Sequence, residues 1–218
     1  MKIYRAILLS IGAFALVIFI ARSYGLNKVH KKRIHPLLSQ IETLSFSEQI
    51  ETWQNTVSAP HFKIYENTNG HLVYKINNQE LLLSDAVDGN EPAYLFSIIK
   101  ESERVNYLLS QIITNNKIED KVIISSPYRN VLMNIRNLRP RWLTTISPNE
   151  LFLSILLSKV FLASLAPLKS EILLLDKNII DPEWISEIPW QEIKRRDKFV
   201  ITSEATNIPI KLSRIRLH

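Results

Sequence analysis

Three side chains of this sequence combine useful chemistry with a suggestive position: His35, Glu42 and Lys100. His35 follows a basic stretch and precedes Glu42, so an imidazole and a carboxylate lie close together in the sequence. Lys100 follows an apolar run, at the kind of strand end where active sites gather, and its ammonium group could bind an anion. Each also has a structural alternative, as a loop histidine, a solvated carboxylate and a solvated lysine.

The other candidates lack partners in the sequence. Ser125 and Ser126 also end a strand-like run, but a serine nucleophile requires a nearby base, and no motif supplies one. His61 and His71 fall in strand-like alternation, where we expect them at the surface rather than as ligands. No two histidines have the spacing of a metal site. The residues by themselves therefore indicate no complete catalytic set.

Composition excludes several classes of protein. The chain has 218 residues, 46% of them hydrophobic, which is enough for one anchored domain but not for two large ones. It has no cysteine, which excludes disulfides and thiolate metal sites. Its few glycines do not form the glycine-rich loop of a phosphate cradle or dinucleotide site.

The formal net charge is +6, and much of it lies in two clusters. We interpret these clusters as solubilising or as attracted to a membrane surface. The sequence argues against nucleic acid as a partner, because no aromatic residues interleave with the basic ones. The clusters are Arg22, Lys28, Lys31, Lys32 and Arg33, and, at the end of the chain, Lys211, Arg214 and Arg216.

An uncharged segment over residues 6–21 lies between Arg5 and Arg22. With its neighbours it approaches the ~20 residues that span a bilayer. We favour an uncleaved single-pass anchor over a signal peptide, because residues 18–20 are bulky where cleavage needs small side chains. The positive-inside rule puts the rest of the chain in the cytoplasm. A signal anchor in an exported protein can violate that rule, so the sequence does not decide on which side of the membrane the domain lies.

The clearest structural signal is the stretch from Lys121 to Thr145. A β-branched run, a segment with apolar residues at helical spacing and a second extended run follow one another, and Arg139–Pro140 ends the helix. Two strands joined by a helix make a βαβ unit, which builds parallel sheets. Because helices and strands alternate from Ser45 to Thr202, the sequence predicts a parallel α/β sheet, open or closed into a barrel.

Local signals refine this order. Ser45–Glu48 has the pattern of a capping box and predicts a helix that begins there and ends at Ala59–Pro60. Asn69–Gly70, between two alternating runs, predicts a hairpin. Leu151–Leu165 is apolar almost all round but is short for a span and contains Lys159, so we expect a buried or membrane-resting helix. The predicted regions are an anchor over residues 1–26, a basic linker over 27–34 and an α/β domain over 35–218.

This order resembles the glycerophosphodiester phosphodiesterase family, of the phosphatidylinositol-phospholipase-C-like barrel superfamily. Four segments carry the resemblance. Residues 82–87 are similar to the family's T-L-x-x-A-L helix, and residues 96–100 are similar to its I-E-I-K strand. Residues 122–140 are similar to its V-x-x-S-S, L, L-R-x-x-P run, and residues 193–200 to its late helix-to-strand step. The resemblance implies a parallel (β/α) barrel of the TIM type, short or incomplete, after one transmembrane helix.

The family's chemistry uses two histidines and acidic residues that hold a divalent metal such as Ca²⁺ or Mg²⁺. The resemblance implies a catalytic role for His35, a metal-ligand role for Glu42 and a ligand-binding role for Lys100. The family's E-x-D motif falls on residues 61–63, where Lys63 puts positive charge at the place of a cation.

Two further positions depart from the family's pattern. The second catalytic histidine falls at Asn77, and the glutamate of I-E-I-K becomes Ile98.

Three hypotheses follow. The first is a membrane-anchored, divergent member with a degenerate site, a pseudoenzyme that binds a phosphorylated lipid headgroup, a glycerophosphodiester or a partner. The second is an active metal-dependent phosphoric diester hydrolase of lipid metabolism. The third is an unrelated membrane-anchored α/β interaction module.

Overall fold

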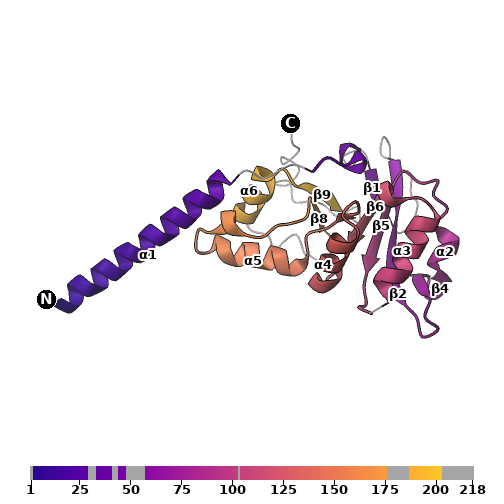
Figure 1. Cartoon of the computed structure of the whole chain (residues 1–218), viewed down its shortest axis with the longest axis horizontal. Helices are drawn as coiled ribbons and strands as arrows, with labels where there is room; N and C mark the ends of the chain where they lie inside the picture. Colours follow the sequence, from indigo (N-terminus) through magenta and orange to yellow (C-terminus); the bar gives the residue numbers. More distant parts are fainter. Residues whose placement is uncertain are drawn as a thin grey trace.

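The computed structural model describes residues 2–28, 33–40, 44–47, 57–102, 104–175 and 187–202. A long helix, α1 (Lys2–Asn27), projects from a body in which helices surround strands (Figure 1). The predicted metal ligand Glu42 lies outside the described residues.

The body is built on parallel strands. They are β1 (Leu44–Ser47), β2 (Val57–Glu66), β5 (Tyr94–Ile98), β6 (Val122–Ser125), β7 (Leu143–Thr144), β8 (Ile172–Leu175) and β9 (Phe199–Thr202). The first five form one ladder in this order, β8 pairs with β9, and a parallel bridge from Thr145 to Ile172 links the two groups.

The order of strands returns to its start, because β9 contacts β1. No ladder joins these two strands in the part of the chain that the structure describes. The buried strands β5, β6 and β8 are covered on both faces, which explains why they read as continuous apolar runs in the sequence. The predicted parallel α/β class, with β6 and β7 as the predicted βαβ unit, is confirmed.

An antiparallel hairpin extends β2. The strands β3 (Leu72–Ile76) and β4 (Gln79–Leu82) follow it, and Ile64 of β2 is opposite Tyr74 of β3. The turn contains Gly70 with a φ of 76°, a left-handed conformation that glycine adopts without steric cost. The hairpin predicted at Asn69–Gly70 is therefore confirmed.

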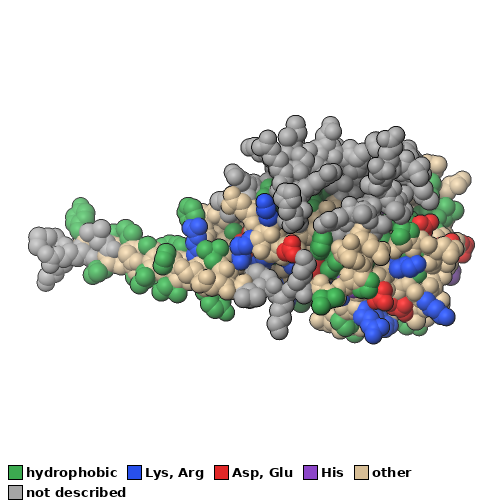
Figure 2. All heavy atoms as spheres, turned by 90° about the horizontal axis from the view of Figure 1, so that it is seen from above, with side chains coloured by type: hydrophobic (Ala, Val, Ile, Leu, Met, Phe, Trp, Pro, Cys, Tyr) green, Lys and Arg blue, Asp and Glu red, His purple; other side chains and the backbone are tan. Residues whose placement is uncertain are grey.

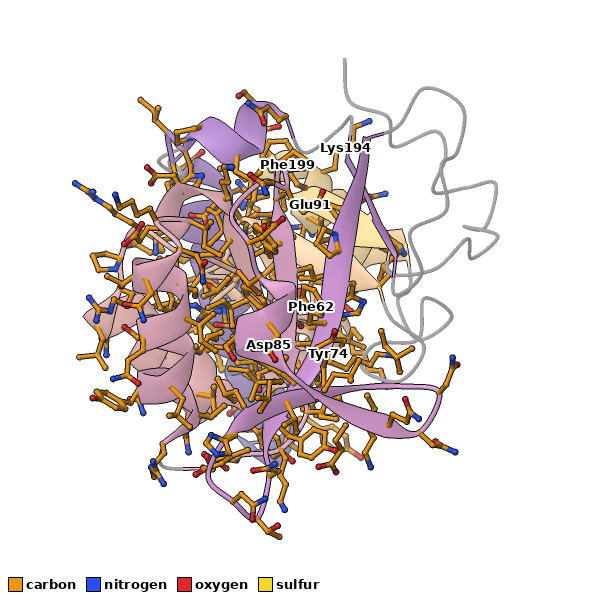
Figure 3. All side chains as sticks on the ribbon, turned by 90° about the vertical axis from the view of Figure 1, so that its right-hand side faces the viewer. Phe62, Tyr74, Asp85, Glu91, Lys194 and Phe199 are labelled. Carbon is orange, nitrogen blue, oxygen red and sulfur yellow. The ribbon has the colours of Figure 1, made fainter. Side chains whose placement is uncertain are left out.

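Helices cover the outer face of β2, β5 and β6. They are α2 (Leu83–Ala86), α3 (Val105–Asn115) and α4 (Arg129–Leu138), and they enclose one apolar cluster. Phe62 of β2 stacks on Phe96 of β5 at 5.9 Å between ring centroids and meets Tyr74 edge-on at 4.9 Å. Figure 3 shows Phe62 and Tyr74 on their strands beside α2.

A second apolar cluster fills the space enclosed by the strands. Its side chains include Ala59, Leu95, Ile123 and Leu174, which come from different strands. Leu37 and Leu38 of the short helix η1 (Pro36–Ser39) pack into the same cluster, so η1 closes the space from one end.

The remaining helices pack around β8. They are α5 (Pro148–Ser158), η4 (Ala163–Leu165) and α6 (Glu187–Arg195), and a third apolar cluster lies between them and the strand. Ser147 and Glu150 form a capping box at the start of α5.

One arginine connects the two halves of the body. Arg136 of α4 donates to Thr144 Oγ1 at 2.9 Å, to the Thr145 carbonyl at 3.0 Å and to Glu150 Oε1 at 2.8 Å, and it also bonds Ser170 Oγ. Both members of the Arg136–Glu150 pair are largely buried, at 16% and 4% side-chain exposure. The network therefore fixes α4, β7, α5 and the start of β8 relative to one another.

The end of α1 is seated on the body. Gly25 is buried, and a Cβ atom there would clash with the side chain of Ser164 in η4. Ser164 Oγ donates to the Arg22 carbonyl at 3.4 Å, and Arg195 of α6 donates to the carbonyls of Leu26 at 3.3 Å and Gly25 at 3.5 Å. The last turn of α1 thus contacts the body directly.

The helix predicted to begin at Ser45–Glu48 is wrong at its start. Residues 44–47 form β1 and pair in parallel with β2, Phe46 opposite Ala59. A hydroxyl and a carboxylate three residues apart can cap a helix, but pairing with β2 determines the conformation here. Residues 48–56 of that predicted helix lie outside the described residues, and its predicted end is also wrong, because residues 57–60 belong to β2.

We expect Arg136→Met to lower the free energy of unfolding by about 3 kcal/mol, because it leaves the buried Glu150 carboxylate without its charged partner. Arg129→Met, an exposed change on the same helix, should stay within about 0.5 kcal/mol. Urea unfolding of the full chain in detergent measures both. Equal midpoints for the two variants would contradict the role given to Arg136.

Candidate functional site

Polar side chains follow one face of β2 and continue across the sheet. Ala59 belongs to the inner cluster, whereas Phe62 and Ile64 belong to the outer one, so the alternation of a strand directs His61 and Lys63 inward. The register sets Lys63 opposite Ser97 of β5, and Ser97 opposite Ser125 of β6. The inner wall is therefore apolar at the start of these strands and polar toward their carboxyl ends.

His61 and Ser97 form a polar contact on this wall. His61 Nε2 lies 2.8 Å from Ser97 Oγ, and the two residues are 4% and 0% exposed. Either atom is the donor, depending on the tautomer of the imidazole. A histidine bonded to a hydroxyl is the arrangement in which a base activates a nucleophile, and it is also a common way to satisfy buried polar atoms.

Ser126 stabilises the turn at the end of β6. Its Oγ donates to the Ile98 carbonyl at 3.2 Å and accepts from the backbone N–H of Tyr128 at 3.1 Å. These bonds hold the turn between β6 and α4. Ser125, one residue earlier, is buried on the inner wall.

The predicted site residues lie at opposite ends of the strands. His35 precedes η1, which contacts η3 (Glu119–Lys121) just before β6. Arg33 bonds the carbonyls of Pro140 and Trp142, which come just before β7. Lys100, in contrast, follows the carboxyl end of β5 and is exposed. The structure therefore does not bring His35 and Lys100 together.

His35 is buried and is held by its own backbone segment. Its Nδ1 accepts the N–H of Leu37 at 3.2 Å and so caps η1. Burial lowers the pKa of the His35 imidazole below its ordinary value, and the positive charge of Arg33 lowers it further. The Arg141 backbone and the carboxylates of Asp120 and Glu171 act in the opposite direction. His35 is thus favoured in its neutral form.

Comparison with known proteins gives information on the fold of the chain. No family model and no curated protein matches the chain. A solved structure from Silicibacter pomeroyi DSS-3, assigned as a glycerophosphoryl diester phosphodiesterase, superposes with a TM-score of 0.54 at 9% identity, over 90% of this chain and 92% of its own. The chain has the fold of the glycerophosphodiester phosphodiesterases. The glycerophosphodiester phosphodiesterase from Agrobacterium tumefaciens str. C58 matches at a TM-score of 0.45 and 7% identity, over 74% of this chain and 81% of its own.

The resemblance to the glycerophosphodiester phosphodiesterases is thus confirmed for the fold, including the barrel of the TIM type. Ile98, predicted at the place of the family's I-E-I-K glutamate, packs in the outer cluster, whereas its neighbour Ser97 faces inward. The inward-facing polar residue at the end of β5 is therefore Ser97.

The inner wall does not fit the divalent metal that the family resemblance implies. Among the described residues there is no group of three or more histidine, aspartate and glutamate side chains that could hold a metal ion. His61, Lys63, Ser97 and Ser125 offer an imidazole, an ammonium group and hydroxyls, whereas Ca²⁺ and Mg²⁺ prefer carboxylate and carbonyl oxygens.

His61 is the residue that the sequence analysis misjudged. It was expected at the surface, but it is buried on the inner wall, while His71 is exposed as expected. The alternation of Ala59, His61 and Lys63 against Phe62 and Ile64 was the available signal. It could not be used because residues 59–60 were assigned to the end of a helix.

Stability should depend on pH through His35. Because the pKa of the folded-state imidazole is below its ordinary value near 6.5, the unfolded chain binds the proton more readily, and stability is lost as pH falls from about 7 through this window. His35→Asn keeps a side chain that can cap η1 but does not titrate. Urea midpoints between pH 7.5 and 5 should fall more steeply for the wild type than for His35→Asn. Parallel curves would contradict this assignment.

Proposed function

We propose that this chain is a membrane-anchored protein that binds a phosphate-bearing lipid headgroup at the carboxyl ends of its parallel strands, without the metal chemistry of the glycerophosphodiester phosphodiesterases. The observation that carries the proposal is the inner wall, where Lys63, His61 and Ser97 offer an ammonium group, an imidazole and a hydroxyl. In the family resemblance, His61 and Lys63 fall on the E-x-D motif that would supply carboxylates to a metal. The proposal has an anchor part and a binding part, and each is argued separately.

The anchor part rests on α1. Residues Leu9–Asn27 have a mean hydropathy of 1.8, and only 6% of the window is buried within the protein. A core helix of a water-soluble protein would bury its apolar side chains, whereas Phe14, Val17 and Phe19 are all exposed. The helix has 26 residues and is ~39 Å long, enough for a hydrocarbon core of ~30 Å.

A retained anchor also agrees with the packing of the end of α1. Gly25 lies against Ser164, and Arg195 bonds the last carbonyls of the helix. These contacts would be lost if the segment were removed as a signal peptide. We therefore infer that α1 stays attached and holds the body at a membrane surface.

The binding part rests on charge and hydrogen-bonding chemistry. Lys63 brings positive charge to a wall that also carries the Ser97 and Ser125 hydroxyls, and Lys100 lies at the same end of the sheet. A phosphate group accepts charge-assisted hydrogen bonds from lysine and further bonds from hydroxyls. The Silicibacter pomeroyi protein bears the name of an enzyme for glycerophosphoryl diesters, which suggests glycerophosphate as the ligand class.

We expect Lys63→Gln to weaken the binding of sn-glycerol 3-phosphate by about tenfold, the effect of losing a charge-assisted hydrogen bond. Lys100→Gln should weaken it as well. Lys75→Gln removes an exposed lysine of β3 and serves as the matched control. Titration calorimetry with the full chain in detergent measures all of these. Equal affinities for Lys63→Gln and Lys75→Gln, or no binding by the wild type, would contradict the binding part.

An active hydrolase is the second candidate, and the His61–Ser97 pair favours it because a base lies beside a hydroxyl. The proposal expects no turnover of glycerophosphocholine or of an activated diester with Ca²⁺, Mg²⁺ or Mn²⁺. Phosphate-release and chromogenic assays on the full chain measure this. Metal-dependent turnover that His61→Gln or His35→Ala abolishes would establish the hydrolase instead.

A further inference from the structure

One face of α5 is apolar and exposed. Phe152, Leu153, Leu156 and Val160 recur at the spacing of a single helix face, and they are between 38% and 65% exposed. The opposite face packs into the body through Leu151, Ser154 and Ser158. We call the exposed residues, together with Phe161, the α5 stripe.

Phe161 has an unusual backbone conformation at the end of this stripe. Its φ is 60°, and its N–H bonds the Ser158 carbonyl at 3.1 Å while the Leu162 N–H bonds the Leu157 carbonyl at 2.8 Å. This is a Schellman motif in which Phe161 occupies the left-handed position that glycine usually takes. The side chain is 62% exposed, so packing within the protein does not offset the steric cost.

The α5 stripe leads into the part of the body that holds the anchor. Leu165 of η4, which follows the stripe in the chain, is exposed as well, and η4 packs against α1 at Gly25. Figure 1 shows the connection from α5 to η4 at the end of the body from which α1 projects. Exposed hydrophobic side chains therefore lie on α1, η4 and α5, and η4 contacts both of the other helices.

Basic residues accompany this surface. Arg22 and Lys28 are exposed at the end of α1, and Lys159 is exposed beside the stripe. Figure 2 shows lysine and arginine side chains where α1 joins the body, next to the hydrophobic side chains of the helix. Lysine and arginine side chains extend from apolar surface toward anionic headgroups at a membrane interface.

We propose that the α5 stripe lies in the headgroup region of the same bilayer that α1 crosses, with Phe161 as its deepest side chain. A helix that exposes an apolar face beside basic residues can lie in the plane of a membrane interface, with the apolar face toward the acyl chains. The inference rests on the anchor part of the proposed function. It adds a second, separate contact that fixes the orientation of the body on the membrane.

Because the chain has no cysteine, single-cysteine variants carry one probe each. Phe152→Cys and Phe161→Cys test the stripe. Phe14→Cys tests the anchor, and Leu138→Cys on α4, 70% exposed and apolar, is the matched control. Each is labelled with the environment-sensitive fluorophore NBD in the full chain and reconstituted in vesicles of phosphatidylcholine and phosphatidylglycerol that contain spin-labelled lipid. We expect lipid quenching at positions 14, 152 and 161 and not at 138.

The outcomes separate the two inferences. Quenching at 14 with positions 152 and 161 indistinguishable from 138 overturns the stripe contact and leaves the anchor in place. Absence of quenching at 14 overturns the anchor, and with it the proposal that the stripe lies in a bilayer that α1 crosses. Probes at 152 and 161 that are shielded from water but not quenched by lipid, and that cross-link between chains, would show that a second copy covers the stripe, which overturns the proposal.

A second variant keeps the test independent of folding. Phe161→Gly suits the left-handed backbone, so the melting temperature in detergent should stay unchanged or rise. In this background we expect the quenching of a probe in Leu156→Cys to fall at least twofold. Unchanged quenching would overturn the role given to Phe161.

Discussion

Two-sided burial of the parallel strands is the constraint on which the rest of the structure depends. Every residue of β5 and β6 is buried, so each side chain is committed either to the outer cluster under the helices or to the enclosed space. On β2 this alternation separates Phe62 from His61. A shift of one residue in register would exchange an aromatic core residue with a titratable one, which makes the register strongly specified.

The polar end of the inner wall is separate from the core of the enclosed space. Apolar residues such as Ala59, Leu95 and Ile123 fill that space, and this packing does not depend on which polar groups lie further along the strands. Lysine, histidine and serine are therefore accommodated at the polar end without disturbing that core. The Arg136 network, which lies between the strands and the helices, stabilises the same core from outside.

The sequence predicted the parts of the fold in which local and tertiary signals agree. The βαβ unit around α4 and the hairpin at Asn69–Gly70 are examples. It failed at Ser45–Glu48, where a local capping pattern competes with strand pairing that only the folded chain supplies. The same error hid the inward position of His61. The bond between His61 and Ser97 joins residues far apart in sequence, so no spacing rule could have found it.

The close contact between Gly25 of α1 and η4 has a mechanical consequence. A helix joined to a domain by a loose linker acts as a tether, and the domain then samples many heights and angles. Here Arg195 and Ser164 hold the last turn of α1, so the helix and the body move as one unit. If α1 crosses a bilayer as proposed, the height of the body above the membrane is fixed, and encounters with a membrane-bound ligand then depend on lateral diffusion and on rotation about α1.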